Sequence, residues 1–191
     1  MLSTVIYDVD SLKLKAQVIA DQLSLQSLSK KEALRSIKAR EEGYYLKVEK
    51  LRCYLQLGLR SKTKPIYCNF SEWAENNKKS NLIRCMKGLP MNCTVLDATA
   101  GFGRDSLELA SVSKSVTLVE RLPWMAFLLE DGLKNTKEEP ALSLIKKFNV
   151  FSMDSYDFLD NDKNNTDVVY LDPMFPKTGS AKAKKSIQAL R

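Results

Sequence analysis

The second half of the chain alternates short apolar runs with longer segments of helical periodicity. Each apolar run has the length of a strand, and each intervening segment can form a helix. This alternation is typical of an α/β fold in which helices connect the strands of a parallel sheet. The last run is almost entirely apolar, which favours a central place in such a sheet. The strands are predicted over residues 95–97, 116–120, 148–151 and 167–171.

The first half of the chain mixes helical and strand patterns. Residues 11–25 have the spacing of an amphipathic helix, with Ser11 as a plausible cap. Residues 44–59 favour strands because β-favouring residues are common there, with a continued helix as the alternative. Further elements are expected as strands over 4–9 and 65–70 and as a helix over 29–42. Residues 71–87 are expected as a helix or partial helix with a basic turn at NNKKSN, residues 76–81. The chain is therefore predicted to divide into a small α+β extension, residues 1–88, and an α/β domain, residues 89–191.

Composition narrows the chemistry. The 191 residues carry 30 Lys and Arg against 23 Asp and Glu, and this net charge of +7 suggests an anionic partner such as RNA or DNA. Histidine is absent, which excludes Ser-His-Asp and Cys-His catalysis and the usual zinc sites, so no metal is expected. Four cysteines without C-x-x-C spacing, and the lack of a secretory or membrane-spanning run, predict reduced thiols in a cytoplasmic protein.

The sequence VLDATAGFGRD, residues 95–105, has the form of a strand, a tight turn and the start of a helix. Asp97 ends the strand, and Gly101 and Gly103 allow backbone N–H groups to approach a ligand. These three residues are predicted to bind the cofactor. A doubly wound α/β domain holds a nucleotide-like cofactor at this place, next to the N-terminus of the following helix. Ser106 replaces the third glycine of the dinucleotide fingerprint, so the turn alone leaves a purely structural role open.

Polar residues follow the next two predicted strands as well. Glu120 lies seventeen residues past Gly103, where a carboxylate can accept hydrogen bonds from both hydroxyls of a ribose. This spacing fits a nicotinamide cofactor and S-adenosylmethionine about equally well. After the third strand, Asp154 and Ser155 can reach an adenine amino group, with a helix cap as the alternative interpretation.

The fourth predicted strand runs into the sequence DPMFP, residues 172–176. Its two prolines make a rigid, non-helical corner at the carboxyl edge of the sheet. The Asp172 carboxylate and the Pro173 carbonyl can accept the hydrogens of an exocyclic amine on a base, and Phe175 can stack on that base. These three residues are the predicted catalytic group, and a sharp turn with a buried Phe is the alternative.

Three motifs together, DATAGFGRD, VTLVER and VVYLDPMFP, resemble the RsmJ family of bacterial small-subunit rRNA guanine-N2 methyltransferases. The resemblance implies a Rossmann-like class I methyltransferase fold over residues 89–191 and S-adenosyl-L-methionine as cofactor. It also implies that the enzyme modifies one guanine of 16S rRNA, free or in the small ribosomal subunit, with residues 172–175 facing that guanine. Oligomeric state stays open. By position, the cofactor would be lined by Arg104, Asp105, Glu120, Arg121, Asp154, Ser155 and Asp172.

The chain departs from the family pattern at two places. Residues 76–84, NNKKSNLIR, lack the glycine cluster and histidine of the family. Only four strands of about seven are predicted before Arg191, so we expect a fold that is incomplete at its C-terminal end, with the fourth strand as an exposed edge and weak or absent turnover. Two alternatives to the methyltransferase are a non-catalytic RNA-binding remnant and an NAD-dependent oxidoreductase.

Overall fold

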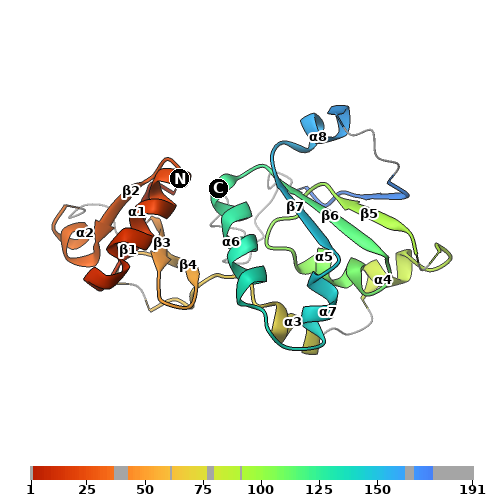
Figure 1. Cartoon of the computed structure of the whole chain (residues 1–191), viewed down its shortest axis with the longest axis horizontal. Coiled ribbons are helices and arrows are strands. Elements are labelled where there is room, and N and C mark those ends of the chain that lie inside the picture. The colour runs from red at the N-terminus through yellow and green to blue at the C-terminus, as the bar shows by residue number, and fades with distance from the viewer. Residues whose placement is uncertain are drawn as a thin grey trace, which may run out of the picture. The chain divides into compact units, whose positions relative to one another are not determined.

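The computed structural model describes residues 2–36, 43–60, 62–76, 80–90, 92–161 and 166–173 (Figure 1). Contacts between residues divide the chain into two compact units, with the division between Tyr67 and Cys68. The N-terminal unit comprises the described residues up to Tyr67, and the second unit comprises those from Cys68 to Pro173. Of the predicted site residues, Phe175 lies outside the described residues.

The N-terminal unit is built on a four-stranded mixed sheet in the order β2-β1-β3-β4. β1 pairs in parallel with β2 and with β3, and β3 pairs antiparallel with β4. The apolar side chains of Ile6, Ala33 and Tyr45 form a small core under α2. Its elements are β1 (Thr4–Tyr7), a 3-10 turn (Asp10–Leu12), α1 (Lys13–Gln22), β2 (Gln26–Ser29), α2 (Lys30–Ser36), β3 (Tyr44–Val48) and β4 (Cys53–Leu57).

Several predictions for this unit are confirmed and three need correction. The strand at β1, the helix at α1 and the pair of strands β3 and β4 are confirmed. β2 was not predicted because its sequence, QSLS, has only one apolar residue. Ser11 lies inside the 3-10 turn and caps no helix, since α1 begins two residues later. The strand predicted over 65–70 is wrong: Ile66 makes a single bridge to Leu55, and helix formation begins at the end of that segment.

The second unit is an α/β fold on a four-stranded sheet whose strands are all parallel, in the order β7-β6-β5-β8. The four predicted strands and the helices between them are confirmed. The described residues of the segment 71–87 form two short helices, α3 and α4, which agrees with the predicted partial helix and basic turn; residues 77–79 of that turn lie outside the described ranges. The elements are α3 (Phe70–Glu75), α4 (Asn81–Cys85), β5 (Thr94–Asp97), α5 (Arg104–Ala110), β6 (Ser115–Glu120), α6 (Pro123–Asn135), α7 (Ala141–Ile145), β7 (Phe148–Ser152), α8 (Ser155–Asn161) and β8 (Val168–Tyr170).

The strand order reverses direction at β5. From β5 the chain proceeds outward to β6 and β7, then returns to place β8 on the other side of β5 (Figure 1). In open α/β sheets, ligands bind outside the carboxyl ends of the strands at such a reversal. Within the described residues β8 pairs only with β5, so it lies at the exposed edge expected for a sheet of four strands, although its apolar sequence is typical of a central strand; Val169 is 47% exposed.

Helices cover both faces of this sheet. On one face, Leu107 and Leu109 of α5 and Leu129 of α6 join Phe70 and the buried strand residues in a single apolar cluster. On the other face, α8 packs Phe158 against Leu96 and Val119, and it lies across the sheet from α5 and α6 (Figure 1). This three-layer arrangement buries most of the two inner strands, β5 and β6, and leaves the carboxyl ends of the strands as the place where polar groups gather.

The division between the units lies earlier than the predicted boundary after residue 88. α3 and α4 pack with the second unit because Phe70 and Met86 belong to its main apolar cluster. A Cβ atom added at Gly132 in α6 would overlap the Cβ of Cys68, so the chain leading into α3 lies directly against α6. The segment between Cys68 and the first parallel strand is therefore part of the α/β unit.

Candidate active site

Backbone groups join the carboxyl ends of β5 and β8. The Ala98 N–H donates to the Tyr170 carbonyl at 3.0 Å, which extends the ladder one residue past β5. The Asp172 N–H then donates to Thr99 Oγ1 at 2.8 Å. The start of the DPMFP corner is thus held against the glycine turn, at the point where the strand order reverses. Thr99 was not among the predicted site residues, although its hydroxyl stands inside the turn motif.

The ends of β6 and β7 are tied to the same edge. The Ala100 N–H donates to the Val119 carbonyl at 3.1 Å, which connects the glycine turn to β6. The Met153 N–H donates to the Glu120 carbonyl at 3.1 Å, which connects the segment after β7 to the end of β6. All four strand ends are therefore linked in one row, and the residues that follow them share one rim.

Glu120 is the best-placed acid on this rim. It is 8% exposed, and its two carboxylate oxygens accept the backbone N–H of Gly101 at 3.0 Å and that of Leu122 at 2.8 Å. Burial raises the pKa of Glu120, and the two N–H donors oppose the shift. A carboxylate has about four acceptor positions, so each oxygen keeps one for a further donor such as a ribose hydroxyl.

Asp97 has a different role from the one predicted by its place at the strand end. Its side chain is 1% exposed, with one oxygen accepting the Thr99 N–H at 3.1 Å and the other accepting the Ser106 hydroxyl at 2.6 Å. Burial raises the pKa of Asp97 to about 6, and these hydrogen bonds oppose the shift. Ser106, which replaces the third fingerprint glycine, thus fastens helix α5 to the end of β5, and Asp97 positions the turn.

The two glycines of the turn are needed for different reasons. Gly101 has φ +55 and directs its N–H to Glu120, so it combines a left-handed backbone with a site contact. Gly103 has φ +77 and caps α5, and a Cβ there would come within 2.7 Å of Leu129 and 3.3 Å of Phe70. Gly103 therefore serves close packing against the interior, while Gly101 is the glycine next to the rim.

The start of α5 contacts β8. Asp105, in the first turn of α5, accepts the Tyr170 hydroxyl at 2.9 Å. Burial is the main cause that raises the pKa of Tyr170, and the hydrogen bond to Asp105 adds to it. Tyr170 was not predicted as a site residue, although it is the only residue with a polar group in the apolar run VVYL. The two predicted arginines, Arg104 and Arg121, are exposed next to this edge.

The residues after β7 match the cap interpretation. Asp154 accepts the Tyr156 N–H at 2.8 Å through its side chain, and its carbonyl accepts the Phe158 N–H at 3.0 Å, so it opens α8. Ser155 is the first residue of that helix. One oxygen of Asp154 keeps an unused acceptor position at the strand end, so a ligand contact remains compatible with the capping role.

The predicted catalytic corner begins on an exposed part of the rim. Asp172 and Pro173 are exposed, and the Asp172 backbone is fixed through Thr99. Its carboxylate and the Pro173 carbonyl can therefore reach a molecule from solvent. The role predicted for Phe175 concerns a residue outside the described ranges.

Acidic groups dominate the rim. Asp97 and Glu120 are buried, and further carboxylates stand after β7, at the start of α5 and after β8. Among the described residues, Arg104 and Arg121 are exposed cations next to the same edge. These carboxylates suit a ligand that has a cationic sulfonium and an adenosine ribose. Their oxygens can accept hydrogen bonds from the ribose hydroxyls, and their negative charge is favourable for the sulfonium. In the described ranges, no three acidic, histidine or cysteine residues gather to hold a metal, and no helix has the length and apolarity needed to cross a bilayer.

The profile of the family of putative SAM-dependent methyltransferases matches residues 27–191. The chain is also similar to the ribosomal RNA small subunit methyltransferase J of Hydrogenovibrio crunogenus, at 31% identity over 93% of this chain and 70% of the relative. The same-named protein of Pseudomonas aeruginosa strain LESB58 is 35% identical over 90% of this chain and 67% of the relative. That of Laribacter hongkongensis is 47% identical over 51% of this chain and 36% of the relative.

A crystal structure of a SAM-dependent methyltransferase from Neisseria gonorrhoeae superposes with a TM-score of 0.69 at 24% identity, covering 91% of this chain and 70% of that chain. The fold and the rim thus define a Rossmann-like class I methyltransferase with S-adenosylmethionine as the cofactor of the class, which confirms the predicted fold and cofactor. The chain belongs to the RsmJ family, ribosomal RNA small subunit methyltransferase J. The chain spans 36% of the Laribacter relative, 67% of the Pseudomonas relative and 70% of the Hydrogenovibrio relative.

Proposed function

We propose that this chain transfers a methyl group from S-adenosylmethionine to the exocyclic N2 of a guanine in 16S rRNA of the small ribosomal subunit. The observation that carries the proposal is the bond between the Asp172 N–H and Thr99 Oγ1, at 2.8 Å. It holds Asp172, the first residue of the DPMFP sequence, against the turn that contacts Glu120. Residues suited to hold an amine and residues suited to hold a nucleoside are thereby brought to one edge.

In this proposal the chain grips the cofactor through Glu120 and the glycine turn. Glu120 accepts the ribose hydroxyls with the acceptor positions that Gly101 and Leu122 leave open. Asp154 and Ser155 face the adenine end, while Asp105 and the two arginines border the site. Asp97 supports the turn from inside and acts as a positioning residue.

The charge of the rim favours a methyl donor over a nicotinamide dinucleotide. NAD carries a pyrophosphate that needs a glycine-rich turn and helix N-terminus free to approach it. Here Ser106 stands in place of the third glycine, Gly103 is packed against Leu129, and carboxylates gather at the edge. A cationic sulfonium has no such conflict, which supports S-adenosylmethionine.

The amine end of the reaction is assigned to Asp172 and Pro173. Bound S-adenosylmethionine supplies a methyl group on a sulfonium, which is activated for transfer. The Asp172 carboxylate and the Pro173 carbonyl would accept the two hydrogens of the guanine amine and orient its lone pair. As the N–C bond forms, the sulfonium S–C bond would break to leave a neutral thioether, and the amine would lose one of these two protons. Positioning of this kind supplies up to about 7–11 kcal/mol of barrier reduction in well-oriented systems. Phe175 is assigned to stacking on the base from the sequence alone.

The substrate assignment is supported by the relatives. Those that align with 90 and 93% of this chain are named as methyltransferases of small-subunit rRNA. The choice of guanine N2 comes from the family resemblance and from the fit of an exocyclic amine to two acceptors. A non-catalytic RNA-binding protein and an NAD-dependent oxidoreductase are the outcomes against which the proposal is tested.

Calorimetric titration of the full 191-residue chain with S-adenosylmethionine, with NAD as control, is the first test. We expect the methyl donor to bind and NAD not to bind. The second test is transfer of a radiolabelled methyl group to small subunits that lack the modification, with nucleoside analysis of the product. Labelled N2-methylguanine supports the proposal, and label at another base contradicts the guanine assignment. Slow labelling agrees with the weak turnover expected from the sequence, whereas robust labelling contradicts that expectation. Binding of NAD alone would overturn the role given to residues 172–175.

A further inference from the structure

The basic charge of this protein is concentrated outside the proposed active site. Residues 1–67 contain thirteen Lys and Arg and seven Asp and Glu, a net charge of +6. Residues 68–173, which carry the rim, contain twelve Lys and Arg and sixteen Asp and Glu, a net charge of −4, and residues 174–191 add five Lys and Arg and no acid. RNA is a polyanion whose binding depends mainly on phosphate contacts. The described part of the unit that carries the rim, residues 68–173, is therefore less suited to attract RNA than the N-terminal unit is.

The N-terminal unit also contains a cavity. It encloses about 430 Å³ between the start of β3, the end of β4 and residues 62–66, and it is lined by Tyr44, Leu57, Lys62, Thr63, Lys64, Pro65 and Ile66. This volume lies in the range of about 300–1,000 Å³ that small-molecule sites occupy. The lining combines an aromatic ring, aliphatic side chains and two cations, and it contains no acid.

The walls of the cavity are fixed by hydrogen bonds. Leu55 and Ile66 exchange two backbone bonds of 2.9 Å, which hold the segment beside β4. The Gln56 side chain donates to the carbonyl and to the hydroxyl of Thr63, both at 3.3 Å. At the other end, the Gly58 N–H donates to the Gly43 carbonyl at 2.8 Å. The cavity is therefore a built feature of this sheet end and needs no ligand to form.

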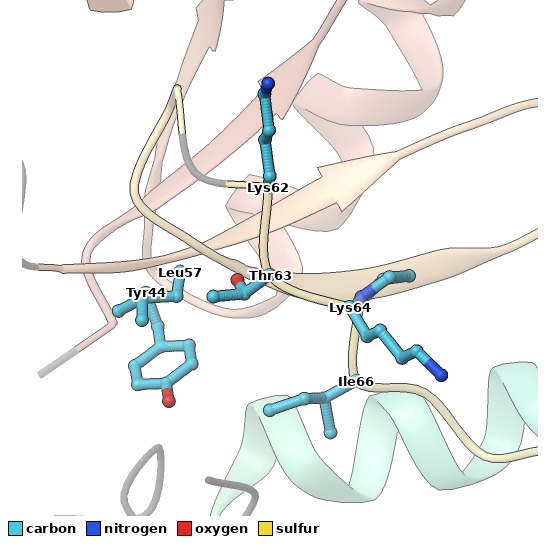
Figure 2. Close-up of a pocket in the computed structure, with 7 residues that line it drawn as sticks. Tyr44, Leu57, Lys62, Thr63, Lys64 and Ile66 are labelled. Carbon is cyan, nitrogen blue, oxygen red and sulfur yellow. The ribbon is translucent and has the colours of Figure 1, made fainter.

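The side chains divide the cavity into an apolar part and a cationic part. In Figure 2 the Tyr44 ring and the Ile66 side chain project to the same side, while the Lys62 and Lys64 side chains extend outward in different directions. Both lysines are exposed, and neither forms an ion pair with a carboxylate in the described parts of the chain. A planar base can occupy the apolar part while its flanking phosphates meet the lysines.

We infer that this cavity is an RNA-docking site, in which an unpaired nucleotide stacks on Tyr44 while Lys62 and Lys64 bind the adjacent phosphates. The inference rests on the proposed function, because it gives the rRNA substrate a second point of attachment, on the N-terminal unit. Proteins that bind single-stranded nucleic acid without strong sequence preference commonly combine aromatic side chains, which stack on bases, with Lys and Arg side chains, which contact phosphates. The site would supply affinity, and the rim would supply the chemistry.

The test compares two charge-matched double variants of the full chain. K62Q/K64Q removes the two cavity cations, and K30Q/K31Q removes two exposed cations from the same unit at the start of α2. Binding of a short fluorescein-labelled single-stranded RNA is followed by anisotropy over a series of KCl concentrations. We expect K62Q/K64Q to weaken binding about tenfold and to lower the salt slope by about one to one and a half, because two phosphate contacts are lost. K30Q/K31Q should change binding by less than about twofold.

The ring is tested separately. Tyr44→Leu removes the stacking surface and should weaken RNA binding about tenfold, whereas Tyr44→Phe keeps the ring and should bind like the unaltered chain. Inorganic polyphosphate serves as a competitor without bases, and it should displace the RNA less effectively than unlabelled RNA does at equal phosphate. Equal displacement, equal losses in the two lysine variants, or no RNA binding by the unaltered chain would each overturn the inference.

The two proposals fail in different measurements. Calorimetry with S-adenosylmethionine should give the same affinity for K62Q/K64Q as for the unaltered chain, since the cavity residues do not belong to the rim. If the chain methylates its substrate and the lysine pair has no effect on RNA binding, the docking inference is wrong and the proposed function stands. If the lysine pair lowers RNA binding but the unaltered chain neither binds nor uses the methyl donor, the docking site stands and the proposed function is wrong.

Discussion

The two units of this chain are each built on a four-stranded sheet, yet they place their polar groups differently. Among the described residues, six polar or charged side chains are buried, and five of them, including Asp97 and Glu120, belong to the parallel-sheet unit. The N-terminal unit buries only Thr4. The parallel unit thus fixes its polar chemistry inside the fold, whereas the N-terminal unit presents its charges to solvent.

The same difference appears in the contacts that charged groups make. In the N-terminal unit, Lys47 and Asp8 form an ion pair of 2.8 Å with side chains 19 and 38% exposed. In the parallel unit, Asp97 is bonded to a hydroxyl and a backbone N–H inside the protein. Half-exposed ion pairs contribute little to stability, while buried polar groups are costly to disturb. Substitutions at the buried network should therefore have much larger effects than substitutions in the N-terminal unit.

The largest expected effect is that of Gly103→Ala. The added Cβ would lie 2.7 Å from Leu129, and the alanine would have to adopt φ +77, which is unfavourable for residues with a side chain. We therefore expect a loss of about 4 kcal/mol in the free energy of unfolding. Gly43→Ala, in the N-terminal unit, meets only the Tyr45 side chain, with the hydroxyl at 3.7 Å, and should cost less than about 1 kcal/mol. Urea unfolding followed by circular dichroism measures both.

A third variant separates backbone strain from packing at that position. Gly88 has φ +95, but an added Cβ there would meet only open space, so Gly88→Ala has the strain without the overlap. If Gly103→Ala proves no more destabilising than Gly88→Ala, close packing against α6 is not the reason for the glycine.

The next expected effect is on cofactor binding. Glu120→Gln removes a charge that would accept two ribose hydroxyls, and hydrogen bonds to charged groups contribute about 1.5–3 kcal/mol each. We expect the affinity for S-adenosylmethionine to fall about a hundredfold in calorimetric titration. Glu130→Gln, which alters an exposed partner of Lys134 on α6, is the control and should leave affinity unchanged. Retained affinity in a folded Glu120→Gln variant would contradict the assignment of Glu120.

Much of the parallel unit could be predicted from the sequence because its signals are local. The strand ends at Asp97 and Glu120 and the glycine turn between them follow from apolar runs that stop at a polar residue. What could not be predicted is which polar residues turn inward. Ser106 looks like a defect in a glycine fingerprint, and only its bond to Asp97 gives it a role. Thr99 and Tyr170 meet their partners across long stretches of sequence, which no local pattern reports.

The N-terminal unit was harder to predict for the same physical reason. β2 has the sequence QSLS and pairs in parallel with β1, so its strand character depends on a partner outside the segment. The segment 65–70 has strand-like composition, yet near its end the Asn69 side chain accepts the Glu72 N–H and so caps the N-terminus of α3. Pairing with β1 therefore determines that β2 is a strand, and capping by the Asn69 side chain determines that a helix begins at the end of the segment 65–70.

The buried network should also make stability depend on pH. Burial raises the pKa of Asp97 to about 6, with Asp105 and Glu120 adding repulsion, while the unfolded chain releases this proton near its ordinary value. The folded state therefore binds the extra proton between about pH 4 and pH 6, and stability falls as the pH rises through this range, by up to about 3 kcal/mol. Asp97→Asn can accept the Thr99 N–H through its Oδ1 and donate its amide N–H to the Ser106 hydroxyl, and it cannot titrate, so it should remove this slope.

Exposed carboxyl groups with lowered pKa values change stability with pH in the opposite direction. The contribution of Asp97 is therefore measured as the difference in unfolding free energy between Asp97→Asn and the unaltered chain. The pKa values of Glu32, Glu139 and Asp167 are lowered by bonds from Ser29, Ser143 and Thr94, respectively, and their stabilisation is lost as the pH falls. Subtracting the urea-unfolding free energies of the unaltered chain from those of Asp97→Asn at each pH cancels these contributions. A difference that does not change between pH 4 and pH 6 would show that Asp97 is ionised throughout that range.

The smallest expected effect concerns the contact between α5 and β8. Tyr170→Phe removes the hydroxyl that donates to Asp105 at 2.9 Å and should lower stability by about 1 kcal/mol, the usual net value of one such bond. Tyr156→Phe removes a hydroxyl from a side chain that is 75% exposed on α8 and should have no measurable effect. If the bond also fixes the strand that leads into the DPMFP corner, amide exchange at Ala98 and Asp172 should be faster in Tyr170→Phe, because their acceptors are the Tyr170 carbonyl and the Thr99 hydroxyl. Unchanged exchange at both amides, together with the loss of stability, would mean that the Tyr170 hydroxyl stabilises the packing of β8 on α5 without positioning the corner.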